Sequence, residues 1–239
     1  MTNDIKTVSE HLNELKNLLI KLFSIWLVAT IGLSFFSQTL IEIFTRPLGE
    51  IALTLNFFSP TESLFFVIKI VSISGLLISS PLIFWLVWKY LSKALESKEK
   101  QFLFNYFFAA LALTITAIIY SYFYLIPASL RFLTDFTPKN TSVILSANEY
   151  SSFILSMFLA ITLIFQTPII VMSLVKTGLV KIETFKTKRK EIYFAILVLT
   201  AAFGSPDVFT WLISSIPVFI LFEGSLILAG KTSDKAKNP

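Results

Sequence analysis

Long uninterrupted apolar runs constrain this sequence more than any other feature. Four runs of 20 or more residues, 18–37, 64–88, 103–126 and 150–175, each contain at most one charged residue. A helix of roughly 20 apolar residues crosses the hydrocarbon core of a bilayer, so each run predicts one membrane span. The apolar stretch 192–230 is broken by the turn residues 204–207 and therefore predicts two shorter spans, 192–204 and 208–230.

The composition agrees with a membrane protein. Of the 239 residues, 55% are hydrophobic and 15% are charged, and a soluble domain of this size cannot bury so much apolar surface. Cysteine is absent and His11 is the single histidine, which excludes disulfides and multi-histidine metal chemistry. We expect an all-α integral membrane protein, one domain of residues 1–239 with six transmembrane helices, and no cofactor or metal.

The distribution of Lys and Arg orients the predicted bundle. Fifteen of these residues lie outside the spans on one side, in the segments 1–17, 89–100, 176–190 and 231–239. The opposite segments contain only Arg46, Arg131 and Lys139. Cytoplasmic loops are enriched in Lys and Arg, so both termini are predicted to be cytoplasmic, N-in and C-in. The same asymmetry explains the net charge of +5 without a nucleic-acid partner.

Two cytoplasmic carboxylates stand out from their neighbours in sequence. Residues 1–17 predict a cytoplasmic amphipathic helix that rests on the interface and runs into the first span, with Glu14 on its polar side. Glu14, like Glu99 in the loop after the second span, has no Lys or Arg three or four residues away if its segment is helical. Either each is a solvated carboxylate, or each binds a cationic partner. Tyr90 lies where aromatic side chains prefer the membrane interface.

Few polar groups fall within the spans. Lys69 lies in the second span and is placed to snorkel to the outer interface. Glu223 lies in the sixth, where it faces a protein interior, pairs with Lys69 or a polar group, or stays protonated. Three prolines are predicted to interrupt and bend their spans: Pro81, Pro168 and Pro217.

Five ordered motifs carry a resemblance to a known family. They are E-H-L-N-E-L-K at 10–16, S-P-T-E-S-L-F at 59–65 followed by Lys69, the block 81–99, F-Q-T-P at 165–168, and S-P-D-V at 205–208 followed by I-P at 216–217 and F-E at 222–223. Their order and the number of spans between them resemble the TatC family, the receptor subunit of the twin-arginine protein translocase. The resemblance covers nearly the whole chain.

This resemblance implies a function. A family member binds twin-arginine signal peptides and, with single-span partners of the TatA and TatB type, transports folded proteins; it is not an enzyme. It also implies a cupped bundle of kinked helices and a homo-oligomer within a receptor complex, in contact with membrane lipid. The family's signal-peptide residues correspond to Glu14 and Glu99, with Lys16 and Tyr90 beside them. The expected location is a bacterial plasma membrane, or a thylakoid or mitochondrial inner membrane if the gene is organellar.

The sequence departs from the family pattern in the fourth span and before the sixth. Gln166 replaces a glutamate; an amide still bonds across helices, whereas a role that requires a charge there is in doubt. Gly204 replaces a threonine, and the polar positions that remain for partner-helix contact are Thr200, Ser205, Asp207 and Thr210.

Two other classes of membrane protein fit the sequence less well. A secondary transporter of a small solute would show inverted repeats and paired broken helices, and the two halves of this sequence do not correspond in that way. A membrane enzyme would show a catalytic motif such as H-E-x-x-H, a P-loop or G-x-S-x-G, and the sequence contains none of these.

Overall fold

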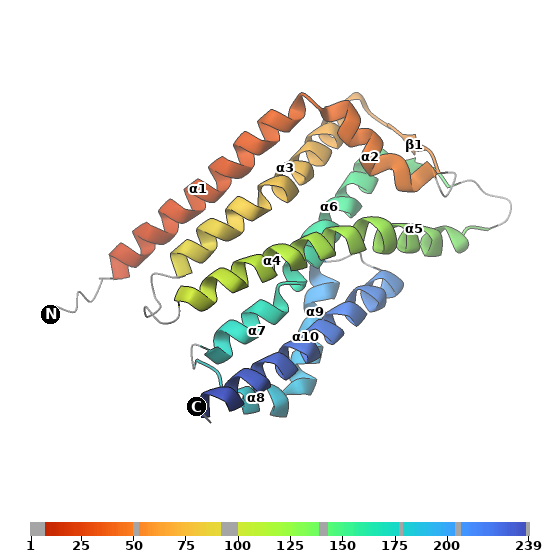
Figure 1. The fold of residues 1–239 in the computed structure, drawn as a ribbon. Helices are drawn as coiled ribbons and strands as arrows, with labels where there is room; N and C mark the ends of the chain where they lie inside the picture. Colours follow the sequence, from red (N-terminus) through yellow and green to blue (C-terminus); the bar gives the residue numbers. More distant parts are fainter. Residues whose placement is uncertain are drawn as a thin grey trace.

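The computed structural model describes residues 8–49, 53–91, 100–138, 143–176, 179–203 and 207–237, most of which are helical (Figure 1). The elements in chain order are α1 (Val8–Ser34), α2 (Ser37–Gly49), β1 (Leu55–Asn56), α3 (Pro60–Leu91), α4 (Lys100–Tyr120), the π-helix η2 (Ser121–Leu125), α5 (Ile126–Asp135), β2 (Leu145–Ser146), α6 (Ala147–Ile164), α7 (Thr167–Lys176), α8 (Ile182–Thr187), α9 (Arg189–Phe203) and α10 (Val208–Lys237).

Five helical stretches in the described ranges are long and apolar enough to cross a membrane. They are Leu12–Ser34, Pro60–Tyr90, Tyr106–Asp135, Ala147–Lys176 and Val208–Gly230. The fifth predicted span, 192–204, corresponds to α9, which has only 15 residues. At 1.5 Å per residue α9 is about 22 Å long, shorter than the roughly 30 Å hydrocarbon core. Within the described residues the structure therefore supports a multi-pass protein with five full-length spans, and it does not confirm the sixth predicted span.

The first helix runs from the predicted amphipathic segment directly into the first span, as the sequence predicts. Residues 8–17 form the first turns of α1 and continue without a break into the apolar span, so no separate interfacial helix precedes it in the described chain. α1 lies along α3 over most of its length (Figure 1). Trp26 Nε1 donates to the carbonyl of Ser72 at 3.1 Å, and one turn further Thr30 lies against Gly75. A small residue at this position lets the two backbones approach closely.

The bundle has two distinct ends. The N-terminal end of α1, the C-terminal ends of α3 and α10 and the N-terminal end of α4 lie at one end, which we call the terminal face (Figure 1). The opposite end, which we call the cap, consists of α2, α5, β1 and β2. β1 and β2 pair in parallel, with Leu55 opposite Leu145 and Asn56 opposite Ser146. The long segments 38–63 and 127–149 between the predicted spans thus contain two helices that the apolar pattern does not reveal.

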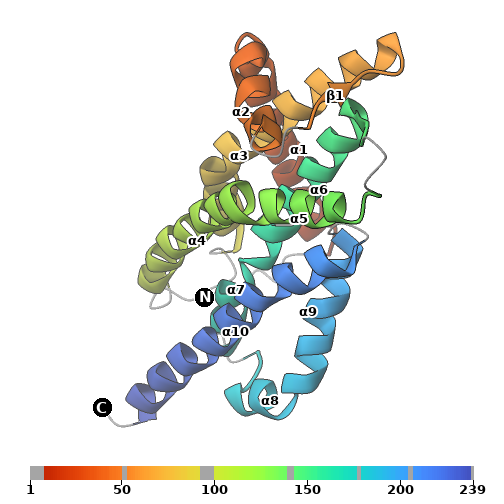
Figure 2. The same cartoon turned by 90° about the vertical axis from the view of Figure 1, so that its right-hand side faces the viewer.

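The fourth span supplies the centre of the bundle. Over half of its most apolar window, 56%, is buried, compared with none of the window in α1. Its buried side chains pack on one side against α2, α3 and α5, through residues such as Tyr150, Ile154 and Phe158. On the other side Ala160 and Ile164 pack against α9 and α10, which lie beside it in both views (Figure 2). α6 and α7 therefore hold the two halves of the molecule together.

Of the three prolines that were predicted to interrupt their spans, only Pro168 coincides with a break in the helix. α6 ends before Pro168 and α7 begins at Thr167, whereas α3 and α10 continue through Pro81 and Pro217. Each proline leaves the carbonyl four residues earlier without a helical amide. Ser80 donates to the carbonyl of Leu77 at 2.7 Å, and Thr167 donates to that of Ile164 at 2.5 Å.

Two further carbonyls of this kind are capped by tyrosines on another helix. Tyr120 Oη donates to the carbonyl of Ile213 in α10 at 3.1 Å, four residues before Pro217. Tyr122 Oη donates to the carbonyl of Ile43 in α2 at 2.7 Å, four residues before Pro47. Neighbouring helices commonly satisfy proline-freed carbonyls in membrane proteins, where water is not available. Both tyrosines therefore stabilise contacts between helices at proline positions.

Candidate functional site

The terminal face contains three of the four residues that the sequence assigns to signal-peptide binding. Glu14 is half-exposed and Lys16 is exposed on α1, and Tyr90 is half-buried in the last turn of α3. Because α1 lies along α3, these side chains come from adjacent helices at one end of the bundle. Glu99 lies in the segment 92–99, outside the described residues. The described part of α3 reaches Leu91 and that of α4 starts at Lys100. The two helix termini that flank this segment therefore both lie at the terminal face (Figure 1).

Gln166 lies at the break between α6 and α7, buried inside the bundle. Its side chain is 8% exposed, and its Nε2 donates to Thr114 Oγ1 of α4 at 3.1 Å. Thr114 in turn donates to the carbonyl of Ala110 at 2.9 Å, so its oxygen is the acceptor for the amide. The backbone carbonyl of Gln166 accepts hydrogen bonds from the amides of Ile169 and Ile170. These bonds form the first turn of α7, which starts at Thr167. The glutamine thus joins two spans through a donor, as a helix-to-helix contact requires.

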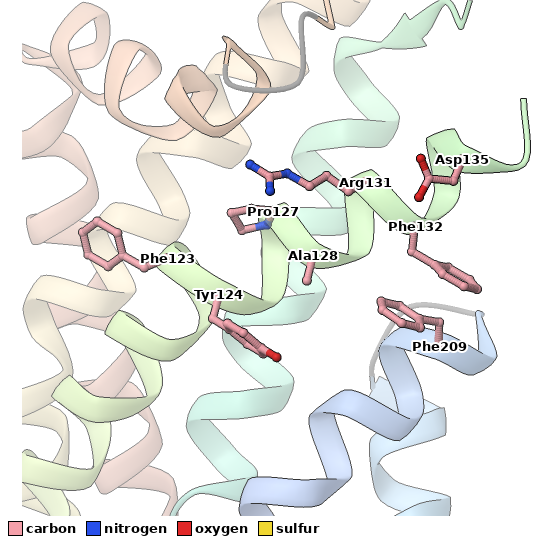
Figure 3. Close-up of a pocket in the computed structure, with 8 residues that line it drawn as sticks. All are labelled: Phe123, Tyr124, Pro127, Ala128, Arg131, Phe132, Asp135 and Phe209. Atoms are coloured by element: carbon pink, nitrogen blue, oxygen red, sulfur yellow. The ribbon is translucent and has the colours of Figure 1, made fainter.

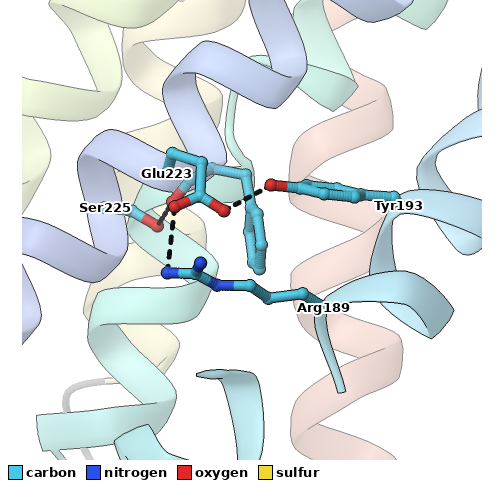
Figure 4. Close-up of polar contacts among 5 residues, drawn as sticks. Arg189, Tyr193, Glu223 and Ser225 are labelled. Atoms are coloured by element: carbon cyan, nitrogen blue, oxygen red, sulfur yellow. Dashed lines mark hydrogen bonds and ion pairs between the residues drawn. The ribbon is translucent and has the colours of Figure 1, made fainter. Parts of the chain in front are cut away.

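Glu223 pairs with a cation from the adjacent helix α9. Its Oε2 lies 3.1 Å from Arg189 Nη2, and its Oε1 accepts a hydrogen bond from Tyr193 Oη (Figure 4). Of the alternatives left open by the sequence, the structure therefore selects pairing, and the partner is Arg189 rather than Lys69. Arg189 and Tyr193 lie one turn apart at the start of α9, so both reach the same carboxylate. The cost of a carboxylate in a membrane helix is offset by a charge and a hydrogen bond.

Lys69 and Glu62 bind the same segment of α6 near the cap, but not each other. Lys69 Nζ donates to the side chains of Asn148 and Ser152, the latter at 2.7 Å. Glu62 accepts hydrogen bonds from Ser146 Oγ and from the backbone amide of Asn148, the latter at 3.0 Å. Lys69 is half-buried and its ammonium is bonded to the start of α6, and its snorkelling to the outer interface stays a prediction. Two polar residues of α3 anchor the start of α6 next to the two-stranded β1–β2 pair.

The start of α3 explains the local role of the motif at 59–65. Ser59 precedes Pro60, which lies at the first helical position, and Ser59 Oγ accepts from the amide of Glu62 at 3.3 Å. Glu62 Oε2 accepts in turn from the amide of Phe58 at 2.6 Å. This reciprocal arrangement resembles a capping box with proline at the first position of the helix. The motif therefore fixes where the second span begins.

The residues assigned to partner-helix contact lie around the junction of α9 and α10. Thr200 and Thr210 are buried within this chain, at 1% and 0% exposed. Asp207 caps α10, since its Oδ1 accepts from the amide of Thr210 at 2.7 Å. Ser205 lies outside the described residues. The two threonines are thus packed within the chain itself, and their contact with a partner remains a prediction.

Sequence reasoning missed the partners of the embedded polar groups. Tyr193, Thr114 and Tyr120 carry no charge and lie within apolar runs, so only the fold shows that they bind Glu223, Gln166 and a proline-freed carbonyl. The prolines themselves were the one available signal, because each demands a donor for a carbonyl. Within the described ranges no three His, Asp or Glu side chains gather as a metal site would require.

Comparisons with protein families, with individual proteins and with solved structures all match the same family over most of this chain. The family model for "Sec-independent protein translocase protein (TatC)" matches residues 10–217. The TatC protein of Aquifex aeolicus (strain VF5) is 32% identical over 236 residues, which cover 96% of this chain and 97% of that relative. TatCy of Bacillus subtilis (strain 168) is 28% identical, over 95% of this chain and 90% of that protein. A crystal structure of the twin arginine translocase receptor TatC superposes with a TM-score of 0.82 at 31% identity, covering 94% of this chain and all of that one.

The fold and these matches define a multi-pass helical membrane protein that is a component of a protein translocase. The chain belongs to the TatC family of Sec-independent protein translocase proteins. The resemblance that the ordered motifs suggested is therefore confirmed.

Proposed function

We propose that this protein is the receptor subunit of a twin-arginine translocase, which binds twin-arginine signal peptides at its terminal face. The observation that carries this proposal is the shared fold with a twin arginine translocase receptor over 94% of the chain. In this reading folded proteins cross the membrane with the help of single-span TatA- and TatB-type partners, and the receptor works as a homo-oligomer.

The proposed binding site consists of Glu14 and Glu99, with Lys16 and Tyr90 beside them. A guanidinium presents a planar fork of donors that matches a carboxylate in a bidentate geometry, which an ammonium does not. Two carboxylates on one face would therefore distinguish an arginine pair from a lysine pair. Glu14 contributes from α1, and Glu99 from the connection between α3 and α4.

The proposal includes six crossings, with both termini in the cytoplasm. α9 makes the short fifth crossing, and its 15 residues require the bilayer to thin locally or the flanking charged residues to snorkel. Arg189 and Lys190 at its first positions are suited to reach the cytoplasmic headgroups.

We place the contact with a partner helix at the α9–α10 junction around Thr200, Ser205, Asp207 and Thr210. Because Thr200 and Thr210 are buried, the contact surface consists of exposed apolar neighbours such as Val198, Leu199 and Val208. These side chains are 48%, 48% and 66% exposed, and helix association in a membrane depends on such packing surfaces.

Crosslinking tests the proposal. The full-length protein in membranes is exposed to a signal peptide that carries a photoreactive residue beside its arginine pair. We expect a crosslink to α1 or to the α3–α4 connection, and little crosslink from the twin-lysine peptide. Equal crosslinking of both peptides would contradict receptor function. A solute transporter would give no crosslink with either peptide.

A further inference from the structure

Two adjoining pockets open beside the start of α5, at the cap end of the bundle. The larger has a volume of about 480 Å³ and is lined by residues of η2, α5 and α10 (Figure 3). The smaller, about 300 Å³, lies between η2, α5 and α2. Phe123 and Pro127 line both pockets, so the two adjoin, and we refer to them together as the depression. None of these residues belongs to the proposed signal-peptide site.

Each pocket contains one exposed arginine. Arg131 lines the larger pocket and Arg46 the smaller. Figure 3 shows the guanidinium of Arg131 extending over Pro127, which is shared with the pocket of Arg46. The one acidic residue of the two linings, Asp135, lies toward the other end of α5 in the same view. The shared part of the depression is therefore positive, and guanidinium groups bind phosphate oxygens in a bidentate geometry.

The walls of the depression are aromatic. Phe132 of α5 and Phe209 of α10 stack with ring centroids 3.8 Å apart and an angle of 6° between the rings. On the opposite side Phe123 and Tyr124 are 72% and 57% exposed. A water-soluble anion gains nothing from such walls, whereas an acyl chain buries apolar surface against them. The combination of cations and apolar walls fits an amphipathic anion.

We expect the depression to lie at the level of the bilayer headgroups, from the place of its two arginines relative to the spans. Arg131 is four residues from the end of the span Tyr106–Asp135, and Arg46 lies in α2, beyond the end of the span Leu12–Ser34. We propose that Arg46 and Arg131 bind the phosphate of an anionic phospholipid, whose acyl chain lies along Phe123 and Tyr124. The lipid would fill the gap between α2 and α5 on the cap side of the bundle.

Native mass spectrometry of the full-length protein tests this site, with phosphatidylglycerol and phosphatidylcholine of equal chain length as probes. We expect wild type to retain phosphatidylglycerol in preference. The variant Arg46→Gln/Arg131→Gln should lose roughly tenfold or more in apparent affinity, since a charge-assisted contact of about 1.5 kcal/mol corresponds to a tenfold change. The control Lys181→Gln/Lys186→Gln removes two exposed cations near α8 and should leave the preference unchanged.

A second variant keeps the proposal testable if the double arginine variant is unstable. Asp135→Asn removes the one carboxylate of the depression and should raise phosphatidylglycerol affinity a few-fold, a change that loss of structure cannot produce. Glycerol phosphate, which has the phosphate but no acyl chain, should not compete. The proposal is overturned if the arginine and lysine double variants lose affinity equally, if Asp135→Asn has no effect, or if glycerol phosphate competes as well as the lipid.

Discussion

The hydroxyl of Tyr120 donates to the backbone carbonyl of Ile213, the carbonyl that Pro217 leaves without a helical partner. Tyr120 is the last residue of α4, directly before the π-helix η2, and Ile213 lies in α10. Tyr122, two residues later, makes the same kind of contact with Ile43 in α2. The segment around η2 thus holds two proline-containing helices in place. π-helical turns often occur where the position of a side chain matters to function.

Tyr120→Phe should destabilise the contact between α4 and α10 by about 1 kcal/mol, because it leaves the carbonyl of Ile213 unpaired in an apolar setting. The ring and its stacking on Phe165 are retained, so the loss reports the hydroxyl alone. Thermal unfolding of the purified protein in detergent measures the effect. Tyr124→Phe is the matched control, since that side chain is 57% exposed. Equal shifts in the two variants would show that the hydrogen bond adds nothing.

Gly75→Ala should separate α1 from α3. A Cβ built at Gly75 lies 2.3 Å from Thr30 Oγ1 and 3.0 Å from both the Cα and the N of Thr30. The side-chain atom can rotate away, but the backbone atoms cannot, and we expect a loss of about 1–3 kcal/mol. Gly224→Ala is the control, because a Cβ there meets nothing within 4 Å. Thermal stability and protease sensitivity of α1 measure the difference, and identical behaviour of the two variants would contradict the close approach.

The contact between Gln166 and Thr114 has a defined polarity that the sequence does not show. Gln166→Leu should weaken α4–α7 association because leucine cannot bond to Thr114, whereas Gln166→Glu should retain it, since the Thr114 hydroxyl can accept from a protonated carboxyl or donate to a carboxylate. A double-mutant cycle with Thr114→Val should give a coupling energy of roughly 0.5–1 kcal/mol. Additive losses in the cycle would mean that Gln166 contributes only packing.

The pair Arg189–Glu223 should be coupled in the same way. Both side chains are partly exposed, at 46% and 33%, so we expect a coupling energy of no more than about 1 kcal/mol. Arg189→Gln leaves the carboxylate with Tyr193 alone, and Glu223→Gln should partly restore stability in that background. Unfolding of the four proteins of the cycle measures the coupling. If Glu223→Gln costs the same with and without Arg189, the pair has no energetic role.

The places of the long spans could be predicted from the sequence, because an apolar run is a local property. Predicted spans such as 64–88 and 150–175 fall within α3 and α6–α7. The fifth span was less predictable, because the described part of α9 has only 15 residues. Helices α2 and α5 were not predicted, because they lie in segments without a long apolar run.

The pairings between spans could not be predicted, because they join residues far apart in sequence. Glu223 and Lys69 were visible as charges in apolar runs, but whether Glu223 pairs with Lys69 or with Arg189 depends on which helices pack together. The resemblance to a family gave the function class, and family membership has confirmed it. The roles of Glu14 and Glu99 remain predictions.

The affinity of a twin-arginine signal peptide for four single variants tests the central claim most directly. Glu14→Gln and Glu99→Gln should each weaken binding by roughly 10- to 150-fold, the loss of one charge-assisted contact of about 1.5–3 kcal/mol. Glu10→Gln and Glu96→Gln, which remove neighbouring charges in the same two segments, should change binding much less. The measurement uses the full-length protein in nanodiscs at a fixed salt concentration, because a diffuse attraction is screened more than a direct pair. If the two control variants lose as much affinity as Glu14→Gln and Glu99→Gln, the attraction is diffuse and these residues do not form the signal-peptide site.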